Sequence, residues 1–218
     1  MLYLAHKLLN EAQVKDFRKS LIISTEWVDG KSSAKGSKVK RNLQLNWGCE
    51  THTKLSEKII EIVENNELIN NFSFSSKIFN ILFTRTGEGM FYGPHTDVAF
   101  TPNGRRDLSF TIFLNSPEDY KGGELILYIP PEKKQIKMNP GEIIVYPTKY
   151  LHEVKAVTEG ERMVCVGWIE SQIPRDDDRE SLSLLKKGIS EIVKQSDIPS
   201  AVQNLNVSFN NIFKRCMN

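Results

Sequence analysis

The segment Phe91-Tyr-Gly-Pro-His-Thr-Asp97 places an imidazole and a carboxylate two positions apart, at His95 and Asp97. Because alternate side chains of an extended backbone leave from the same face, these two residues can bind one ion together. His152 offers a third donor later in the chain. Two nitrogens and one carboxylate oxygen form the facial set that holds non-haem Fe(II) and leaves positions open for other ligands. The sequence therefore predicts an open iron site, with a zinc hydrolase as an alternative use of the same ligands.

Short β-rich runs surround these residues. From Phe74 onward the runs are separated by turns that contain Gly, Pro and Asn, a texture typical of a sandwich or barrel. Eight strands indicate a jelly roll. The expected strands are Lys77–Arg85, Asp97–Thr101, Asp107–Leu114, Glu124–Tyr128, Gln135–Met138, Glu142–Tyr146, His152–Val157 and Glu161–Ser171.

Helical patterns flank the β-rich region. Apolar residues at helical spacing predict three helices: one from Glu11 to about Leu21 capped by Asn10, one from Lys54 to about Ile69, and one from Arg179 to about Gln195. Between the first two, residues 22–27 are expected to be extended. The fold class is thus α+β, mainly β: an N-terminal support region (residues 1–73), a jelly-roll domain (74–171) and a C-terminal helical extension (172–218), forming one compact unit.

Arg162 is expected to point into the interior. If the turn at residues 158–160 joins a hairpin in which Val157 faces Glu161, then His152 and Arg162 share a face that is otherwise apolar. A buried guanidinium needs an anionic partner. That partner could be an Asp or Glu elsewhere in the chain, or a bound dicarboxylate, since Arg suits bidentate recognition of carboxylates.

Composition narrows the function classes. With 218 residues and a net charge of +2, the chain fits one globular unit and does not suggest a nucleic-acid-binding surface. Its locally basic run, Lys31–Arg41, is expected to be a solvated loop. The cysteines Cys49, Cys165 and Cys216 are widely spaced and odd in number, which favours a reducing compartment. Neither a basic leader nor a membrane-spanning apolar run is present, so a cytoplasmic location and no membrane partner are expected.

Taken together, the motifs resemble those of the iron- and 2-oxoglutarate-dependent dioxygenases, most closely the branch of PKHD-type hydroxylases related to prolyl 4-hydroxylases. The resemblance is close over residues 80–171, and Trp27-Val-Asp-Gly30 and Lys40-Arg-Asn42 are similar to the N-terminal part of that branch. The motifs that carry it are Tyr92-Gly-Pro-His95-Thr-Asp97, Arg106-Asp-Leu-Ser-Phe-Thr-Ile-Phe-Leu114, Tyr120-Lys-Gly-Gly-Glu-Leu125, Tyr146-Pro-Thr-Lys-Tyr-Leu-His152, Val157-Thr-Glu-Gly-Glu-Arg162 and Gly167-Trp-Ile-Glu-Ser171.

The resemblance implies a double-stranded β-helix in which His95, Asp97 and His152 hold Fe(II). It implies that Arg162 binds the distal carboxylate of 2-oxoglutarate, that O2 is consumed, and that the cosubstrate leaves as succinate and carbon dioxide while a substrate C–H bond is hydroxylated. Ascorbate enters as a reductant. Tyr92, three positions before His95, is expected at the pocket wall.

The expected substrate is a prolyl, or another, residue of a protein or peptide. Nucleic-acid demethylases of the superfamily carry a second Arg six positions after the first, where this chain has Trp168, so no nucleic-acid partner is expected. Prolyl 4-hydroxylases proper usually have Lys in place of Arg162, so their peptide specificity does not transfer directly. The alternatives are a small-molecule hydroxylase of the same superfamily and a jelly-roll binding protein that retains metal without catalysis.

Overall fold

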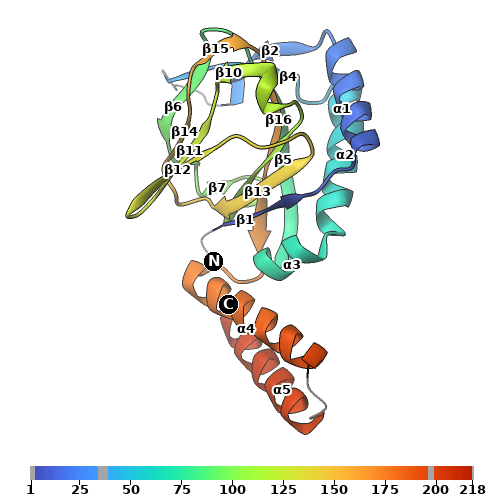
Figure 1. Ribbon diagram of the computed structural model, residues 1–218, viewed down its shortest axis with the longest axis vertical. Helices are drawn as coiled ribbons and strands as arrows, with labels where there is room; N and C mark the ends of the chain where they lie inside the picture. The colour runs from blue at the N-terminus through green and yellow to red at the C-terminus, as the bar shows by residue number, and fades with distance from the viewer. Residues whose placement is uncertain (1–2, 34–38, 196–198, 218) are drawn as a thin grey trace.

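Two antiparallel sheets face each other at the centre of the computed structural model, which describes residues 3–33, 39–195 and 199–217 (Figure 1). The seven-stranded sheet has the order β1-β13-β9-β16-β5-β4-β2, and the five-stranded sheet the order β12-β11-β14-β6-β3. Their strands are β1 (Leu4–Lys7), β2 (Trp27–Asp29), β3 (Lys40–Arg41), β4 (Leu43–Leu45), β5 (Ser75–Thr86), β6 (Phe91–His95), β9 (Leu108–Phe113), β11 (Leu125–Ile129), β12 (Glu132–Ile136), β13 (Glu142–Pro147), β14 (His152–Val154) and β16 (Arg162–Ser171).

Two further sheets of the described chain have two strands each: β7 (Phe100–Thr101) pairs with β8 (Gly104–Arg105), and β10 (Tyr120–Gly122) pairs with β15 (Val157–Gly160). Single turns of 3-10 helix lie at Gly30–Ser33 and Pro117–Asp119. The prediction of a mainly β jelly roll with helices at both ends is confirmed.

The seven-stranded sheet is buried on both faces, which explains why β9 reads as an uninterrupted buried run. One face packs against α1 (Glu11–Ile23) and α2 (Glu50–Glu64), whose apolar stripes include Phe17 and Ile59. The other face meets the five-stranded sheet across a smaller core that contains Phe113, Leu127 and Val164. Polar side chains also point into this space between the two sheets.

The helix boundaries differ from expectation at the second helix. Asn10 caps α1 with a full capping box, as its position predicts. The helix expected from Lys54 to Ile69 instead begins at Glu50, where the Cys49 side chain accepts the cap hydrogen bond, and stops at Glu64. Asn66 then caps a separate helix, α3 (Glu67–Ser73), by accepting from the Ile69 amide. Because cysteine is not a favoured N-cap residue, residue preferences did not predict that α2 begins at Glu50.

Several strand boundaries also differ. Residues 22 and 23 belong to α1 rather than to an extended segment. The strand expected over Asp97–Thr101 is reduced to β7, because Asp97 lies in the loop that follows β6. The strand expected over His152–Val157 divides into β14 and the start of β15.

The predicted hairpin between His152 and Arg162 is wrong. β14 lies in the five-stranded sheet and pairs with β11 and β6, whereas β16 lies in the seven-stranded sheet and pairs with β5 and β9. The intervening β15 pairs with β10, so the chain crosses from one sheet to the other between the two residues. His152 and Arg162 both line the cavity between the sheets, and they reach it from opposite walls.

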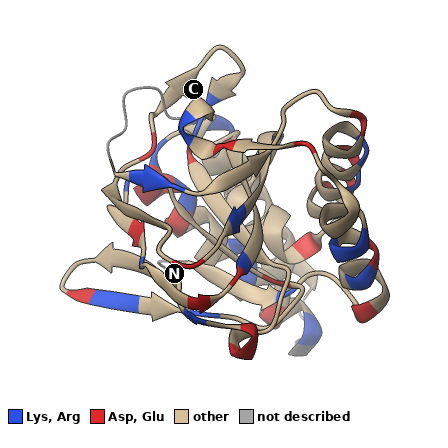
Figure 2. Ribbon diagram, turned by 90° about the horizontal axis from the view of Figure 1, so that it is seen from above, with Lys and Arg blue, Asp and Glu red and all other residues tan. Residues whose placement is uncertain are grey.

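The C-terminal helices α4 (Asp176–Gln195) and α5 (Pro199–Cys216) form a hairpin that extends away from the sheets (Figure 1). It meets the rest of the protein at α3 and at a cluster in which Phe74 contacts Phe209 and Phe213. None of the described helices has the length and apolar character needed to span a membrane. Charged residues of both signs are mixed over the molecule seen from above (Figure 2).

Candidate metal centre and cosubstrate pocket

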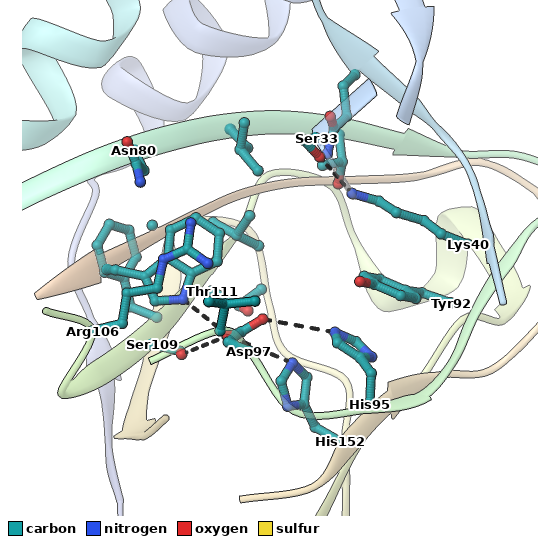
Figure 3. Close-up of a pocket in the computed structure, with 18 of the residues that line it drawn as sticks. Ser33, Lys40, Asn80, Tyr92, His95, Asp97, Arg106, Ser109, Thr111 and His152 are labelled. Carbon is teal, nitrogen blue, oxygen red and sulfur yellow. Dashed lines mark hydrogen bonds and ion pairs between the residues drawn. The ribbon is translucent and has the colours of Figure 1, made fainter. Parts of the chain in front are cut away.

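His95, Asp97 and His152 converge between the sheets. His95 ends β6, His152 begins β14, and the two are direct antiparallel partners with ring centroids 4.2 Å apart. Asp97 follows two positions after His95, and the candidate ligand atoms of all three lie within 4.8 Å of one another (Figure 3). The structure thus brings together the three residues that the sequence singled out, as the spacing of His95 and Asp97 predicts.

Hydrogen bonds fix the direction of both imidazoles. Nδ1 of His95 lies 2.9 Å from the carbonyl oxygen of Gly93, and Nδ1 of His152 lies 3.0 Å from that of Tyr150. Since a carbonyl can only accept, Nδ1 carries the proton in each ring and Nε2 keeps its lone pair. Both Nε2 atoms face Asp97, at 3.8 Å and 3.9 Å from its oxygens. The metal-binding tautomer is therefore set by the backbone of the same strand or of the turn before it.

Asp97 is held by the opposite sheet. Its Oδ2 accepts hydrogen bonds from Ser109 Oγ in β9 and from Trp168 Nε1 in β16, both at 2.9 Å. Ser109 is in turn bonded to Thr148 at 2.9 Å. Burial, followed by the charge of His152, lowers the pKa of His95 to about 4, so this ring is a neutral ligand at neutral pH. Two imidazole nitrogens and an oriented carboxylate match the donor set for Fe(II).

Arg162 lies deep in the same cavity. Only 3% of its surface is exposed, and its guanidinium sits 5.4 Å from the ring centroid of Phe113. Within the described residues it forms no ion pair, and its Nε has no hydrogen-bond partner. Burial lowers the pKa of Arg162, an effect opposed by Tyr120 and Tyr146. An unpaired buried guanidinium requires an external anion, and a dicarboxylate suits it.

Tyr92 lines the cavity beside the triad. Its ring stacks on His95 with centroids 3.6 Å apart and 13° between the planes. Burial raises the pKa of Tyr92 to about 12, so the hydroxyl stays protonated. The expected position at the pocket wall agrees with this placement.

Sequence reasoning missed other residues of the cavity. Lys40, Asn42 and Gln44 alternate along adjoining short strands, are each less than one tenth exposed, and all line it. Polar residues at every second position could have indicated that these side chains point into the cavity, because alternate residues of a strand share a face. Arg106 and Ser109 lie in the motif that runs from Arg106 to Leu114, whose sequence assigns them no role, and their positions beside Asp97 reveal one.

Comparison with known proteins identifies the family. Residues 81–170 match the model of the 2OG-Fe(II) oxygenase superfamily. Over 215 residues, 97% of each chain, the sequence is 38% identical to a PKHD-type hydroxylase of Prochlorococcus marinus strain MIT 9313, and it is 41% identical over 98% of each chain to one from strain MIT 9515. The chain belongs to the PKHD-type hydroxylases. It is therefore a 2-oxoglutarate-dependent dioxygenase that uses Fe(II), 2-oxoglutarate and O2.

Solved structures agree with this PKHD-type fold. A prolyl hydroxylase from Trichoplax adhaerens, in complex with a peptide fragment of hypoxia inducible factor, aligns with a TM-score of 0.59 at 18% identity, over 84% of this chain and 87% of that one. A prolyl-4-hydroxylase from Pseudomonas putida aligns with a TM-score of 0.55 at 19% identity, over 78% and 92%. At such identities the likeness concerns the fold.

Proposed function

We propose that His95, Asp97 and His152 hold the iron of this dioxygenase. The observation that carries the proposal is the convergence of two Nε2 lone pairs and one carboxylate within 4.8 Å, with the Nδ1 position of both imidazoles already used by the backbone. Thr148, Ser109 and Trp168 keep Asp97 turned toward the imidazoles.

Arg162 binds the distal carboxylate of 2-oxoglutarate in this proposal. Its burial and the absence of an ion-pair partner among the described residues support the role, and the hydroxyl groups of Tyr120 and Tyr146 interact with it electrostatically. When bound, iron with 2-oxoglutarate and O2 supplies the oxidation, in which one oxygen atom enters a substrate C–H bond and the other enters succinate as carbon dioxide is lost. The chain's own residues orient the cosubstrate, exclude water and place the substrate.

The substrate we propose is a prolyl, or another, residue of a polypeptide. The cavity has a volume of about 660 Å³, larger than the cosubstrate alone needs. Trp47 and Val98 line the cavity, and their large apolar side chains are 52% and 66% exposed. Exposed apolar residues beside a cavity are expected where a polypeptide substrate is bound. The prolyl hydroxylase from Trichoplax was solved in complex with a peptide fragment, which supports the same substrate class here.

Anaerobic titration with Fe(II), followed by a 2-oxoglutarate turnover assay in air, tests the assignment. One iron should bind per chain, and succinate should form. His152→Ala should abolish both, because two ligands cannot hold the ion, whereas Arg162→Ala should keep iron binding and raise the KM for 2-oxoglutarate by about tenfold or more. His6→Ala, a substitution of the same kind outside the cavity, is the matched control.

Iron binding and succinate formation that both survive in His152→Ala would refute the assigned ligands. Candidate proteins incubated with the enzyme, iron and 2-oxoglutarate should gain the mass of one oxygen atom, located by mass spectrometry. The use of ascorbate as a reductant stays a prediction, and a higher number of turnovers before inactivation in its presence is the corresponding result.

A further inference from the structure

The cavity is unequally charged. Asp97 is the only carboxylate among the described residues that line it, whereas Lys40, Arg106 and Arg162 all line it. Once the cofactors are bound, the charges of Fe(II) and Arg162 are balanced by Asp97 and the two carboxylates of 2-oxoglutarate. No further carboxylate among the described lining residues then faces Lys40, which is buried, or Arg106, which is half-buried. Buried cations are rarely left unpaired unless a ligand supplies the partner.

Lys40 enters the cavity from the five-stranded sheet. It is 5% exposed and stands opposite Tyr92 in the pairing of β3 with β6. Its Nζ donates to Ser33 Oγ at 2.8 Å and lies 5.1 Å from the centroid of the Tyr92 ring. A hydroxyl and an aromatic face satisfy the ammonium group in part, and neither neutralises it. Burial lowers the pKa of Lys40 to about 8, against the attraction of Asp97 and Asp29.

Arg106 reaches the same space from the other side of Asp97 (Figure 3). Its guanidinium lies over the Trp168 ring, 3.8 Å from the centroid, and its Nε is buried without a hydrogen-bond partner. Burial lowers the pKa of Arg106, and Asp97 opposes the effect. Because Asp97 Oδ2 is already bonded by Ser109 and Trp168, the guanidinium keeps donors free for another acceptor.

We propose that the substrate carries a carboxylate close to the carbon that is hydroxylated, and that Lys40 and Arg106 bind this carboxylate from two sides of the metal site. The inference rests on the proposed function, because it names the substrate class of that same site. Gln44, whose buried Nε2 also lacks a partner, lines the same cavity and offers one more donor. Such a set of donors would favour acidic over neutral or basic substrates through charge-assisted hydrogen bonds.

The exposed apolar mouth indicates where the carboxylate comes from. Trp47 and Val98 offer a contact surface that a small acid could not cover, whereas a peptide could lay an apolar side chain there and an acidic one inside. We therefore expect an Asp or Glu next to the modified residue. A free small acid could supply the same carboxylate, so small acids are also among the ligands to be tested.

Binding calorimetry with the protein loaded with Zn(II) and saturated with 2-oxoglutarate tests this without turnover, because zinc is not redox-active. The probes are end-blocked peptides of one sequence around a central proline with Asp, Asn or Lys beside it, together with N-acetylproline and acetate. The Asp peptide should bind about tenfold more tightly than the Asn peptide, and the Lys peptide more weakly still. Lys40→Met and Arg106→Met should each remove most of this preference.

A charge reversal separates recognition from a structural role. Lys40→Glu should shift the preference toward the Lys peptide, which a merely destabilised cavity would not do. Arg41→Met is the matched control: it removes a charge from the same strand at an exposed position outside the cavity, and it should keep the wild-type preference.

Equal binding of the three peptides by the wild-type protein, or an unchanged preference in both Met variants, would overturn the proposal. If only the small acids bind, and the Met variants lose this binding, the site recognises a carboxylate but the carboxylate does not belong to a peptide. If none of the probes binds while the iron-loaded enzyme still forms succinate, the carboxylate proposal fails and the proposed function stands. Absence of succinate and of iron binding would instead refute the proposed function.

Discussion

Lys40 carries its charge into the protein interior without an ion pair in the part of the chain that the structure describes. Before substrate binds, this arrangement destabilises the fold, since the loss of water from the ammonium outweighs its contacts with Ser33 and the Tyr92 ring and the attraction of Asp97 and Asp29. A residue kept at a cost to stability is typical of a binding site.

Lys40→Met should therefore stabilise the protein by about 3 kcal/mol at pH 7, because the lowering of the Lys40 pKa from 10.5 to about 8 implies a penalty of that order. Between pH 8 and 10.5 the unfolded state holds the proton that the folded state has released, so wild-type stability rises with pH in that window. The advantage of the variant should be complete below pH 8 and vanish toward pH 10.5. Urea unfolding at several pH values measures it, and a pH-independent difference would contradict the explanation.

Trp168→Phe isolates the hydrogen bond that orients Asp97. The ring still packs under Arg106, but Asp97 Oδ2 loses one of its two donors. We expect metal affinity to fall by about tenfold, the usual effect of removing such an outer partner. Co(II) titration measures it, with Trp27→Phe as control because that indole donates to Ser24 outside the cavity. Unchanged affinity would mean that Ser109 alone suffices.

The metal ligands could be predicted from the sequence because two of them are neighbours in one extended segment. His95 and Asp97 are brought together by local geometry, and Arg162 was recognisable as an inward cation in an apolar strand. Lys40 was expected in the solvated loop Lys31–Arg41, and this prediction is wrong for Lys40: the residue is buried in β3, because the pairing of β3 with β6 places it beside Tyr92. That pairing is a contact between distant segments, which a local pattern does not contain.

At the level of elements, β14 and β16 were wrongly predicted to form a hairpin, yet the prediction that His152 and Arg162 point into the interior is correct. The turn-like residues between them belong to β15, which pairs with β10. Apolar alternation tells which face of a strand is buried, but not which sheet the strand joins. The sequence of β1 likewise does not tell which sheet it joins; its four residues pair with β13 at the edge of the seven-stranded sheet.

Gly167 lies in a closely packed part of β16. A Cβ at this position would lie 2.5 Å from the Phe110 ring and 2.8 Å from Ile81. Gly167→Ala should therefore destabilise the protein by about 1–3 kcal/mol through overpacking. Gly188→Ala in α4 is the contrast, because nothing lies within 4 Å there, and it should stabilise by up to about 1 kcal/mol. Thermal unfolding compares the two, and equal effects would refute the packing argument.

Across the whole molecule, the C-terminal hairpin and the metal site are separate in space. The hairpin meets the rest of the chain at α3, around Phe74 and through an ion pair of Asp176 with Lys149, and none of its described residues lines the cavity. The sequence predicted α4 but not its outward direction, since an amphipathic helix can cover a sheet or pair with another helix.

Phe213→Ala should loosen this hairpin and leave the site intact, because Phe213 packs against Phe74 with ring centroids 5.3 Å apart. Amide exchange in α5 should quicken, whereas Fe(II) affinity and succinate formation should match the wild type. Hydrogen-exchange mass spectrometry combined with the turnover assay checks both. A parallel fall in iron affinity would show that the hairpin and the site are coupled.

The hydrogen bonds around Asp97 also bear on the persistence of the enzyme. Its donors Ser109 and Trp168 belong to the seven-stranded sheet, whereas both imidazoles are carried by the five-stranded sheet. An ion held by His95, Asp97 and His152 would thus join β6 to β14 directly, and through the hydrogen bonds of Asp97 it would also tie them to the seven-stranded sheet, so its binding disfavours unfolding. Scarcity of iron would then shorten the lifetime of the protein against proteolysis in addition to halting its chemistry.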